Sequence, residues 1–454
     1  MSTPRPKREG RRPGCYVVAL LCLLGLVAVY AVPSWQVDKE LARLRAAGAL
    51  VDIQTLLPKV PPGERNAADL YQQAYQGLVS VKDLDGFPRY PSGAPPFYWN
   101  EAFSTWPADL QSKARELVTH NGAAYELTTQ AAAMPACAFP IAWDDPLMDP
   151  QREGSRMRLL SRLVILHGRL AARDGKVREA LEDCVSLVRM GNHVLQEPET
   201  LLQGSARLPY QNAVCVLEEA LCRADPDPEQ CRRLFDLLSR TDLTAAAVRA
   251  RQGDLARAPA MFAALRNKQV PIEPFFKDWK PGDPPDYLLR AYPTVGRPMF
   301  DRDCTRGLRF LERAIKATAE PWPRNWRDLE AIEADEEALP RYHLVAVTVA
   351  APPHITRTRE EAAAKLRAAQ IALALLCYKH DHGGYPADLA TLEGAGWKTP
   401  ADPFTGRPFV YRREGRGFIV YSLGPDGVDQ GGQPYDSTST TRARAYDLPF
   451  RCAR

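Results

Sequence analysis

The hydrophobic pattern of the chain opens with one long uncharged run. Residues 15–32 read CYVVALLCLLGLVAVYAV and contain no charged side chain. A helix needs about 20 apolar residues to cross a bilayer core, so the run predicts a transmembrane helix over 15–33. Five basic residues in the tail 1–14 precede it, and the positive-inside rule places this tail in the cytoplasm and the rest of the chain outside. A signal peptide cleaved after Ala31 is the alternative interpretation.

Helical periodicity dominates the chain after the anchor. The strongest pattern covers 155–195, where apolar residues recur at helix spacing on both sides of Asp174-Gly175. Glycine after a helix end favours a turn, so this stretch predicts a helical hairpin. The hairpin resembles one tetratricopeptide unit, but no second copy follows at that period. We therefore predict a mainly α protein with a solenoid-like body of helical hairpins.

Proline clusters mark the boundaries between predicted segments. The stretches 85–100 and 270–300 are rich in Pro and aromatic residues, which is typical of loops and connectors rather than packed helices. The predicted segments are a basic tail (1–14), an anchor (15–33), a helical region with a Pro-rich loop (34–150), a helical-hairpin body (151–268), a Pro-rich connector (269–300), a helical connector (301–355) and a C-terminal α+β domain (356–454).

The C-terminal segment has a different pattern. An amphipathic helix over 360–380 ends before Gly383-Gly384, and the alternation around Val410 and over 418–421 predicts a two-stranded hairpin. Three motifs follow one another here: YKHDHGGYP (378–386), DPFTGRPF (402–409) and YSLGPDG (421–427). They resemble the motifs Y-x-x-D-x-G-x-Y-P, D-P-W-G-N-P-Y and Y-S-L-G-A-D-G in the globular domain of the major pseudopilin of type II secretion. The resemblance covers about residues 359–436.

Two departures from that family limit what the resemblance implies. A pseudopilin carries Glu at the fifth mature position, where this chain has Ala19, and its membrane helix runs directly into the globular domain. Here a long helical region separates the two, so we expect a membrane-tethered helical protein rather than a filament subunit. The whole chain also resembles uncharacterised membrane-anchored envelope proteins of planctomycetes, which implies no activity.

Acidic residues gather in the glycine-rich loop after the third motif. Calcium is bound by six to eight oxygens from carboxylates and backbone carbonyls, often on a flexible loop. The resemblance implies Leu423 and Asp426 as ligands, whereas the spacing of the second acidic ligand fits neither Asp429 nor Asp436. A turn that simply closes the hairpin is the alternative. The predicted Ca²⁺ site consists of Leu423, Asp426, Asp429 and Asp436.

Other combinations of reactive residues give weaker indications. Asp144-Asp145 with Asp149 or Glu153 would suit a hydrolase, but such residues are usually turn formers. His380 and His382 are two positions apart at a helix end and face different directions. No catalytic motif such as GxSxG, HExxH or a phosphate-binding loop occurs, so we predict no enzymatic activity, no catalytic residues and no small-molecule substrate.

Charge and cysteine content restrict the function further. The net charge of +4 comes entirely from the tail, and the remaining chain is balanced, which argues against nucleic-acid binding. The cysteines show no metal-binding spacing; Cys222 and Cys231 flank a turn and would suit a disulfide or be separate buried thiols. We therefore expect a non-enzymatic, single-pass protein of the cytoplasmic membrane, mostly extracytoplasmic, with unidentified protein partners. An accessory subunit of a type II secretion or pilus-like machine and an envelope hydrolase with a dispersed acidic site are the alternatives.

Overall fold

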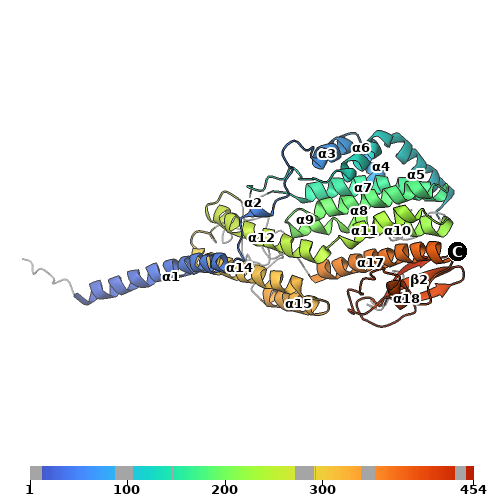
Figure 1. Cartoon of the computed structure of the whole chain (residues 1–454). Coiled ribbons are helices and arrows are strands. Elements are labelled where there is room, and N and C mark those ends of the chain that lie inside the picture. Colours follow the sequence, from blue (N-terminus) through green and yellow to red (C-terminus); the bar gives the residue numbers. More distant parts are fainter. Residues whose placement is uncertain are drawn as a thin grey trace, which may run out of the picture. The chain divides into compact units, whose positions relative to one another are not determined.

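The computed structural model describes residues 13–86, 106–145, 148–270, 291, 293–338, 353–434 and 446–453. Helices make up most of these residues, and the strands form one small sheet (Figure 1). The prediction of a mainly helical chain with an apolar N-terminal helix is confirmed. Most of the two Pro-rich stretches and the predicted ligand Asp436 lie outside the described residues.

The chain divides into two compact units. Unit 1 comprises Met1–Leu50, Ala258–Glu312 and Glu336–Ala350, and unit 2 comprises Val51–Arg257, Arg313–Asp335 and Ala351–Arg454. Unit 2 contains the C-terminal segment as well as most of the helices.

Unit 1 is built around α1 (Pro13–Ala46), with parts of α12 (Leu243–Arg266) and α14 (Arg297–Ala319). The large apolar side chains described between Tyr16 and Val32 are exposed, and this helix is long and apolar enough to cross a membrane. Farther along α1, the buried carboxylate of Glu40 pairs with Arg43 at 2.8 Å and with Arg309 of α14 at 3.3 Å. One end of α1 is therefore suited to lipid and the other to protein.

Unit 2 begins with short helices and continues with long ones. Its helices up to residue 239 are α2 (Ile53–Leu56), α3 (Ala67–Gln76), α4 (Val81–Gly86), α5 (Ala108–His120), α6 (Gly122–Ala133), α7 (Gln151–Arg173), α8 (Val177–Leu195), α9 (Thr200–Gly204), α10 (Arg207–Arg223) and α11 (Pro228–Ser239). The first part of α12, the end of α14 and most of α15 (Arg324–Glu337) follow.

Local sequence signals explain where several of these helices begin and end. The chain turns between α7 and α8 at Gly175, whose φ of +78° is easily adopted only by residues without a side chain. The side chain of Asp227 accepts a hydrogen bond from the amide of Glu229 and caps α11, with Pro228 in the first helical position. The predicted helical hairpin over 155–195 is confirmed.

The C-terminal segment forms a long helix and an antiparallel sheet. It contains α17 (Pro353–His382), α18 (Leu389–Gly394) and the strands β1 (Val410–Glu414), β2 (Gly417–Ser422) and β3 (Leu448–Cys452). The sheet order is β1-β2-β3; Tyr411 pairs with Val420 across the first ladder, and Val420 pairs with Phe450 across the second. In addition to the predicted hairpin of β1 and β2, the sheet therefore contains a third strand, β3, which pairs with the edge of β2 that faces away from β1.

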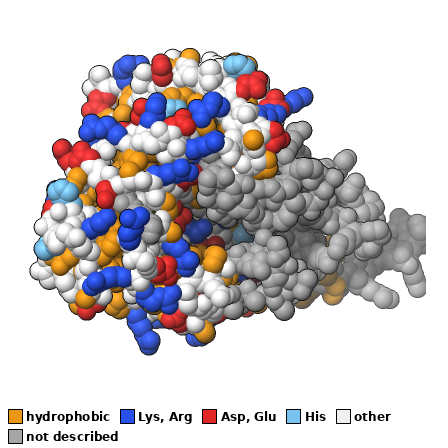
Figure 2. Space-filling view, turned by 90° about the vertical axis from the view of Figure 1, so that its right-hand side faces the viewer, with side chains coloured by type: hydrophobic (Ala, Val, Ile, Leu, Met, Phe, Trp, Pro, Cys, Tyr) orange, Lys and Arg blue, Asp and Glu red, His pale blue; other side chains and the backbone are white. Residues whose placement is uncertain are grey.

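The C-terminal segment shares its core with the helices before it. One side of α17 packs on α10 and α11, and another packs on β2 and β3, so that α7, α8, α10, α17 and the sheet follow one another through unit 2 (Figure 1). The buried side chains of Leu373 and Phe418 belong to the same apolar cluster as Leu187 of α8. Figure 2 shows the face of the molecule that lies on the right-hand side of Figure 1. Among the described residues of this face, Lys and Arg are scattered among acidic, polar and hydrophobic side chains.

Candidate functional site

The predicted calcium loop begins where β2 ends. The amide of Leu423 donates a hydrogen bond to Oδ2 of Asp402 at 3.2 Å, which fixes the direction of the chain as it leaves the strand. Gly424 follows with a φ of +67°, and a side chain there would clash with the carbonyl oxygen of Tyr446. The loop and the segment before β3 are thus in close contact.

The two predicted carboxylates that the structure describes accept hydrogen bonds within the loop. Asp426 accepts from the amide of Val428 at 3.1 Å and from the side chain of Gln430 at 2.8 Å. Asp429 accepts from the hydroxyl of Tyr421 at 2.9 Å and from the amide of Gly431 at 2.8 Å. The closing-turn alternative explains these bonds without a metal ion.

Asp447 is a further carboxylate at this loop that the sequence analysis missed. It is fully buried, and its Oδ2 accepts hydrogen bonds from the amides of Gly432 at 2.7 Å and Gln430 at 3.0 Å. Burial raises the pKa of this carboxyl group, and the nearby charge of Asp429 adds to the effect. Alternation of apolar residues at 448, 450 and 452 could have revealed the short strand that positions it.

Two oxygens beside the loop lack a hydrogen-bond partner within the described part of the chain. They are Oδ1 of Asp447 and Oε1 of Gln430, and both are buried. Buried oxygens without a donor are destabilising, and a bound cation or water would satisfy them. Among the described residues, no three carboxylate, imidazole or thiol side chains form a group that could hold a metal, so a cation here would need carbonyl and amide oxygens as well.

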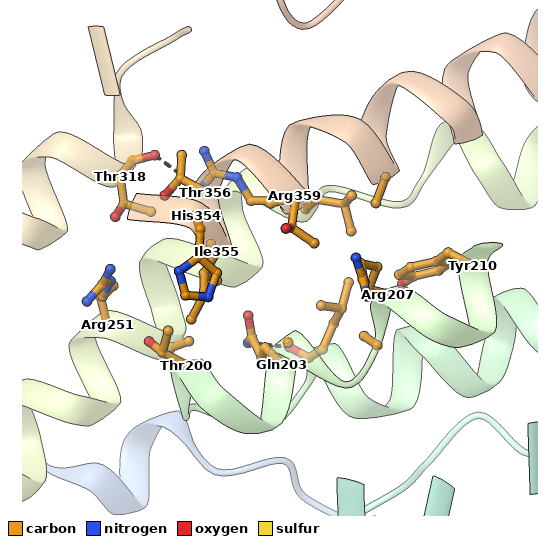
Figure 3. A pocket seen from close by; sticks show the side chains of 18 residues that line it. Thr200, Gln203, Arg207, Tyr210, Arg251, Thr318, His354, Ile355, Thr356 and Arg359 are labelled. Carbon is orange, nitrogen blue, oxygen red and sulfur yellow. Dashed lines mark hydrogen bonds between the residues drawn. The ribbon is translucent and has the colours of Figure 1, made fainter. Parts of the chain in front are cut away.

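A cavity of about 310 Å³ lies elsewhere in unit 2, and sequence reasoning gave no indication of it. Its walls come from α9, α10, α12, the end of α14 and the start of α17 (Figure 3). Leu195, Leu243 and Ile355 contribute apolar surface, and His354 points from α17 toward Thr200 and Gln203. The cavity is therefore apolar in part, with polar groups at defined places.

The polar groups of the cavity are mainly hydroxyls and guanidinium groups, together with the imidazole of His354. Arg359 donates to the backbone oxygen of Thr318 at 3.5 Å and pairs with Glu360 at 2.6 Å. The hydroxyl of Thr318 is buried without a hydrogen-bond partner in the described structure. Arg207 and His354 form no hydrogen bond or ion pair with any described residue, so both remain able to bind an anion.

A pair of carboxyl groups lies next to this cavity. Thr200 lines the cavity and donates its hydroxyl to Oδ2 of Asp254, which lies close to Glu199. Burial, together with the charge of Asp254, raises the pKa of Glu199 to about 7. One proton is therefore retained on this pair at pH values where an exposed carboxyl group has lost it.

The other candidates from the sequence do not come together. Asp144 and Asp145 are exposed, and neither lines the cavity. Nδ1 of His380 lies 3.0 Å from Oδ1 of Asp381, whereas Nδ1 of His382 contacts the carbonyl oxygen of Tyr378 at 3.0 Å. The two imidazoles thus have different partners, as their spacing predicts.

Comparison with known proteins adds no assignment to these sites. No protein-family model, no curated protein and no solved structure matches the chain.

Proposed function

We propose that this chain is a non-enzymatic protein of the bacterial envelope, held in the cytoplasmic membrane by α1 and extracytoplasmic over the rest of its length. The observation that carries the proposal is the row of exposed apolar side chains between Tyr16 and Val32, which water would solvate poorly. The basic tail before it supplies the topology. The helical body would bind protein partners, and the C-terminal segment, which resembles a pseudopilin domain, would bind calcium.

A pair of topology measurements tests the anchor. A reporter enzyme active only outside the cytoplasm, fused after Arg454, should be active in the cell. A fusion of the same reporter at the N-terminus should be inactive. Alkaline washing of membranes should leave the full chain in the pellet, because a spanning helix resists extraction. A full chain recovered in the cytoplasmic fraction would overturn the proposal.

The calcium site is supported by the unpaired oxygens of Asp447 and Gln430. A cation there would also lie near Asp429, whose charge already affects Asp447. A ligand that binds only the folded state raises the melting temperature by mass action. Millimolar calcium should therefore raise the melting temperature of the detergent-solubilised full chain, and magnesium should raise it less because it demands a tighter octahedral site.

Variants identify the ligands in that experiment. Asp429→Asn and Asp447→Asn should each remove the calcium response. Asp388→Asn is the matched control, because Asp388 is an exposed helix cap in the same segment and should leave the response intact. Equal melting in calcium and in chelator would show that the loop is a hydrogen-bonded turn only.

We propose as a second candidate function that the cavity of unit 2 binds a small organic anion. The favouring observation is the combination of the buried, unpaired hydroxyl of Thr318 with the guanidinium of Arg207 and the imidazole of His354. Benzoate should bind the full chain in calorimetric titration, and Arg207→Gln should weaken it. Benzamidine has the same ring with the opposite charge and should not bind. Equal binding of the two probes, or of neither, would contradict the idea.

A further inference from the structure

Two cysteines face each other between a helix of the body and the long C-terminal helix. Cys231 lies in the first turn of α11 and Cys377 lies near the end of α17, and both are buried. Each thiol is the largest influence on the pKa of the other, which places the two side chains next to each other. The thiol of Cys377 also lies 3.7 Å from the carbonyl oxygen of Pro228, one turn before Cys231 in α11.

Ion pairs fix the two helices around these thiols. Arg232 follows Cys231 and pairs with Asp381 of α17 at 3.2 Å. Lys379 pairs with Asp225, which precedes α11, at 3.1 Å. These contacts bracket the cysteines on both helices, so the two helices are held together on either side of the thiols.

We propose that Cys231 and Cys377 form a disulfide in the mature protein, which covalently joins the C-terminal segment to the helical body. The inference rests on the proposed extracytoplasmic location, because disulfides persist in oxidising compartments. It replaces the disulfide between Cys222 and Cys231 that the sequence suggested. The thiol of Cys222 instead lies 3.9 Å from the carbonyl oxygen of Arg451 in β3.

The reaction is a thiol–disulfide exchange with an external disulfide, either that of an oxidoreductase or oxidised glutathione. The neighbouring thiol of Cys231 lowers the pKa of Cys377, so Cys377 reacts first as the thiolate. It forms a mixed disulfide and releases one thiol of the oxidant. Cys231 then loses its proton, attacks the sulfur of Cys377 and releases the second thiol. Two protein thiols are oxidised, and one external disulfide is reduced to two thiols.

Peptide mapping of the full chain from its own membranes tests the pairing. Free thiols are alkylated under denaturing conditions, and the chain is digested with trypsin without reduction. Cys231 then lies in the peptide 224–232 and Cys377 in 368–379, whereas Cys222 lies in 208–223. A linked pair of 224–232 with 368–379 supports the proposal. A link of 224–232 to 208–223, or alkylation of both cysteines in a chain that the reporter places outside the cytoplasm, overturns it.

A second arm separates this proposal from the proposed location. The full chain is purified under reducing conditions in detergent and then exposed to oxidised glutathione. If the reporter shows a cytoplasmic chain, the proposed function fails, and the oxidation experiment alone decides the cysteine pairing. Formation of the same linked peptide pair then supports the disulfide, and absence of that pair overturns it.

Melting measurements show whether the bond stabilises the fold. Oxidation should raise the melting temperature by about 10 °C, because a cross-link that closes a long loop restricts the unfolded chain. The increase should disappear in Cys231→Ala and in Cys377→Ala. It should persist in Cys222→Ala, in which a different thiol has been removed. An equal increase in all three variants would show that another pair is responsible.

Discussion

Nδ1 of His167 in α7 lies 2.6 Å from Oδ2 of Asp183 in α8. The other carboxylate oxygen of Asp183 accepts a hydrogen bond from the hydroxyl of Tyr125 in α6 at 2.7 Å. The ring of Tyr125 stacks on that of His167, with centroids 4.1 Å apart. One buried carboxylate thus joins three helices, and the arrangement is structural because both of its oxygens serve to hold neighbouring side chains.

Replacing Asp183 should destabilise unit 2 markedly. Asp183→Ala leaves His167 and Tyr125 without their shared acceptor in a buried environment, which typically costs about 2–4 kcal/mol. Chemical denaturation of the full chain in detergent measures the loss. Asp149→Ala is the control, because within the described part of the chain the carboxylate of Asp149 accepts one hydrogen bond, from the amide of Gln151. A change in unfolding free energy no larger than that of the control would remove the role assigned to Asp183.

Asp402 should be equally important in the C-terminal segment. Its carboxylate is buried and accepts from the amides of Phe404 and Leu423 and from the hydroxyl of Ser422. Asp402→Ala should therefore cost about 2–4 kcal/mol, since these donors would be left unpaired. Asp388→Ala removes an exposed helix cap and should cost clearly less. Similar losses of unfolding free energy in the two variants would show that the hydrogen bonds to Asp402 do not stabilise the C-terminal segment as proposed.

Stability should depend on pH through Glu199. Its pKa is raised from the ordinary 4.5 to about 7 by burial first and then by the charge of Asp254. The folded chain therefore holds a proton that the unfolded chain releases, and wild type loses stability as the pH rises from 4.5 to about 7. Glu199→Gln has no proton to release and keeps an oxygen for the amide of Leu202.

The melting temperature of Glu199→Gln, relative to wild type, should accordingly increase across that pH interval and stay constant above it. Glu179→Gln is a control at an exposed position of α8. If the difference in melting temperature between Glu199→Gln and wild type does not change with pH, the carboxyl group of Glu199 ionises with an ordinary pKa.

Local signals in the sequence were sufficient for many element boundaries. Gly175 and Asp227-Pro228 mark helix boundaries that depend only on neighbouring residues. The β-branched and aromatic run over 418–421 identifies β2, although its residues are all buried and do not alternate. Within the region 34–150, which was predicted to be helical, the chain leaves the helical conformation between α1, α2 and α3 near Gly48, Pro58 and Gly63.

Long-range relationships could not be predicted in the same way. The strand β3 is five residues long and is separated from β2 by residues 423–447 of the sequence, and Asp447 reaches its site through the pairing of the two strands. The contact between Cys231 and Cys377 depends on the packing of α11 against α17, which no local pattern specifies. Only two of the four predicted calcium-site residues bring carboxylates to the described loop, and the unpaired oxygens there belong to Gln430 and Asp447.

Two glycines of the C-terminal segment allow the cost of a left-handed backbone to be measured apart from the cost of a steric clash. Gly406 and Gly424 have nearly the same backbone conformation, with φ values of +69° and +67°. A side chain at Gly406 would point into open space, whereas one at Gly424 would meet the carbonyl oxygen of Tyr446. Gly406→Ala should therefore cost about 1–2 kcal/mol, which is the ordinary cost of the left-handed conformation. Gly424→Ala should cost clearly more, because the segment before β3 must also move away.

The calcium response provides a second measure of the same contact. Displacement of Tyr446 would carry Asp447 with it and separate its carboxylate from the amides of Gln430 and Gly432. Gly424→Ala should thus lose the calcium-dependent increase in melting temperature, and Gly406→Ala should retain it. Equal destabilisation by the two substitutions would show that the close approach of the loop to Tyr446 does not exist in solution.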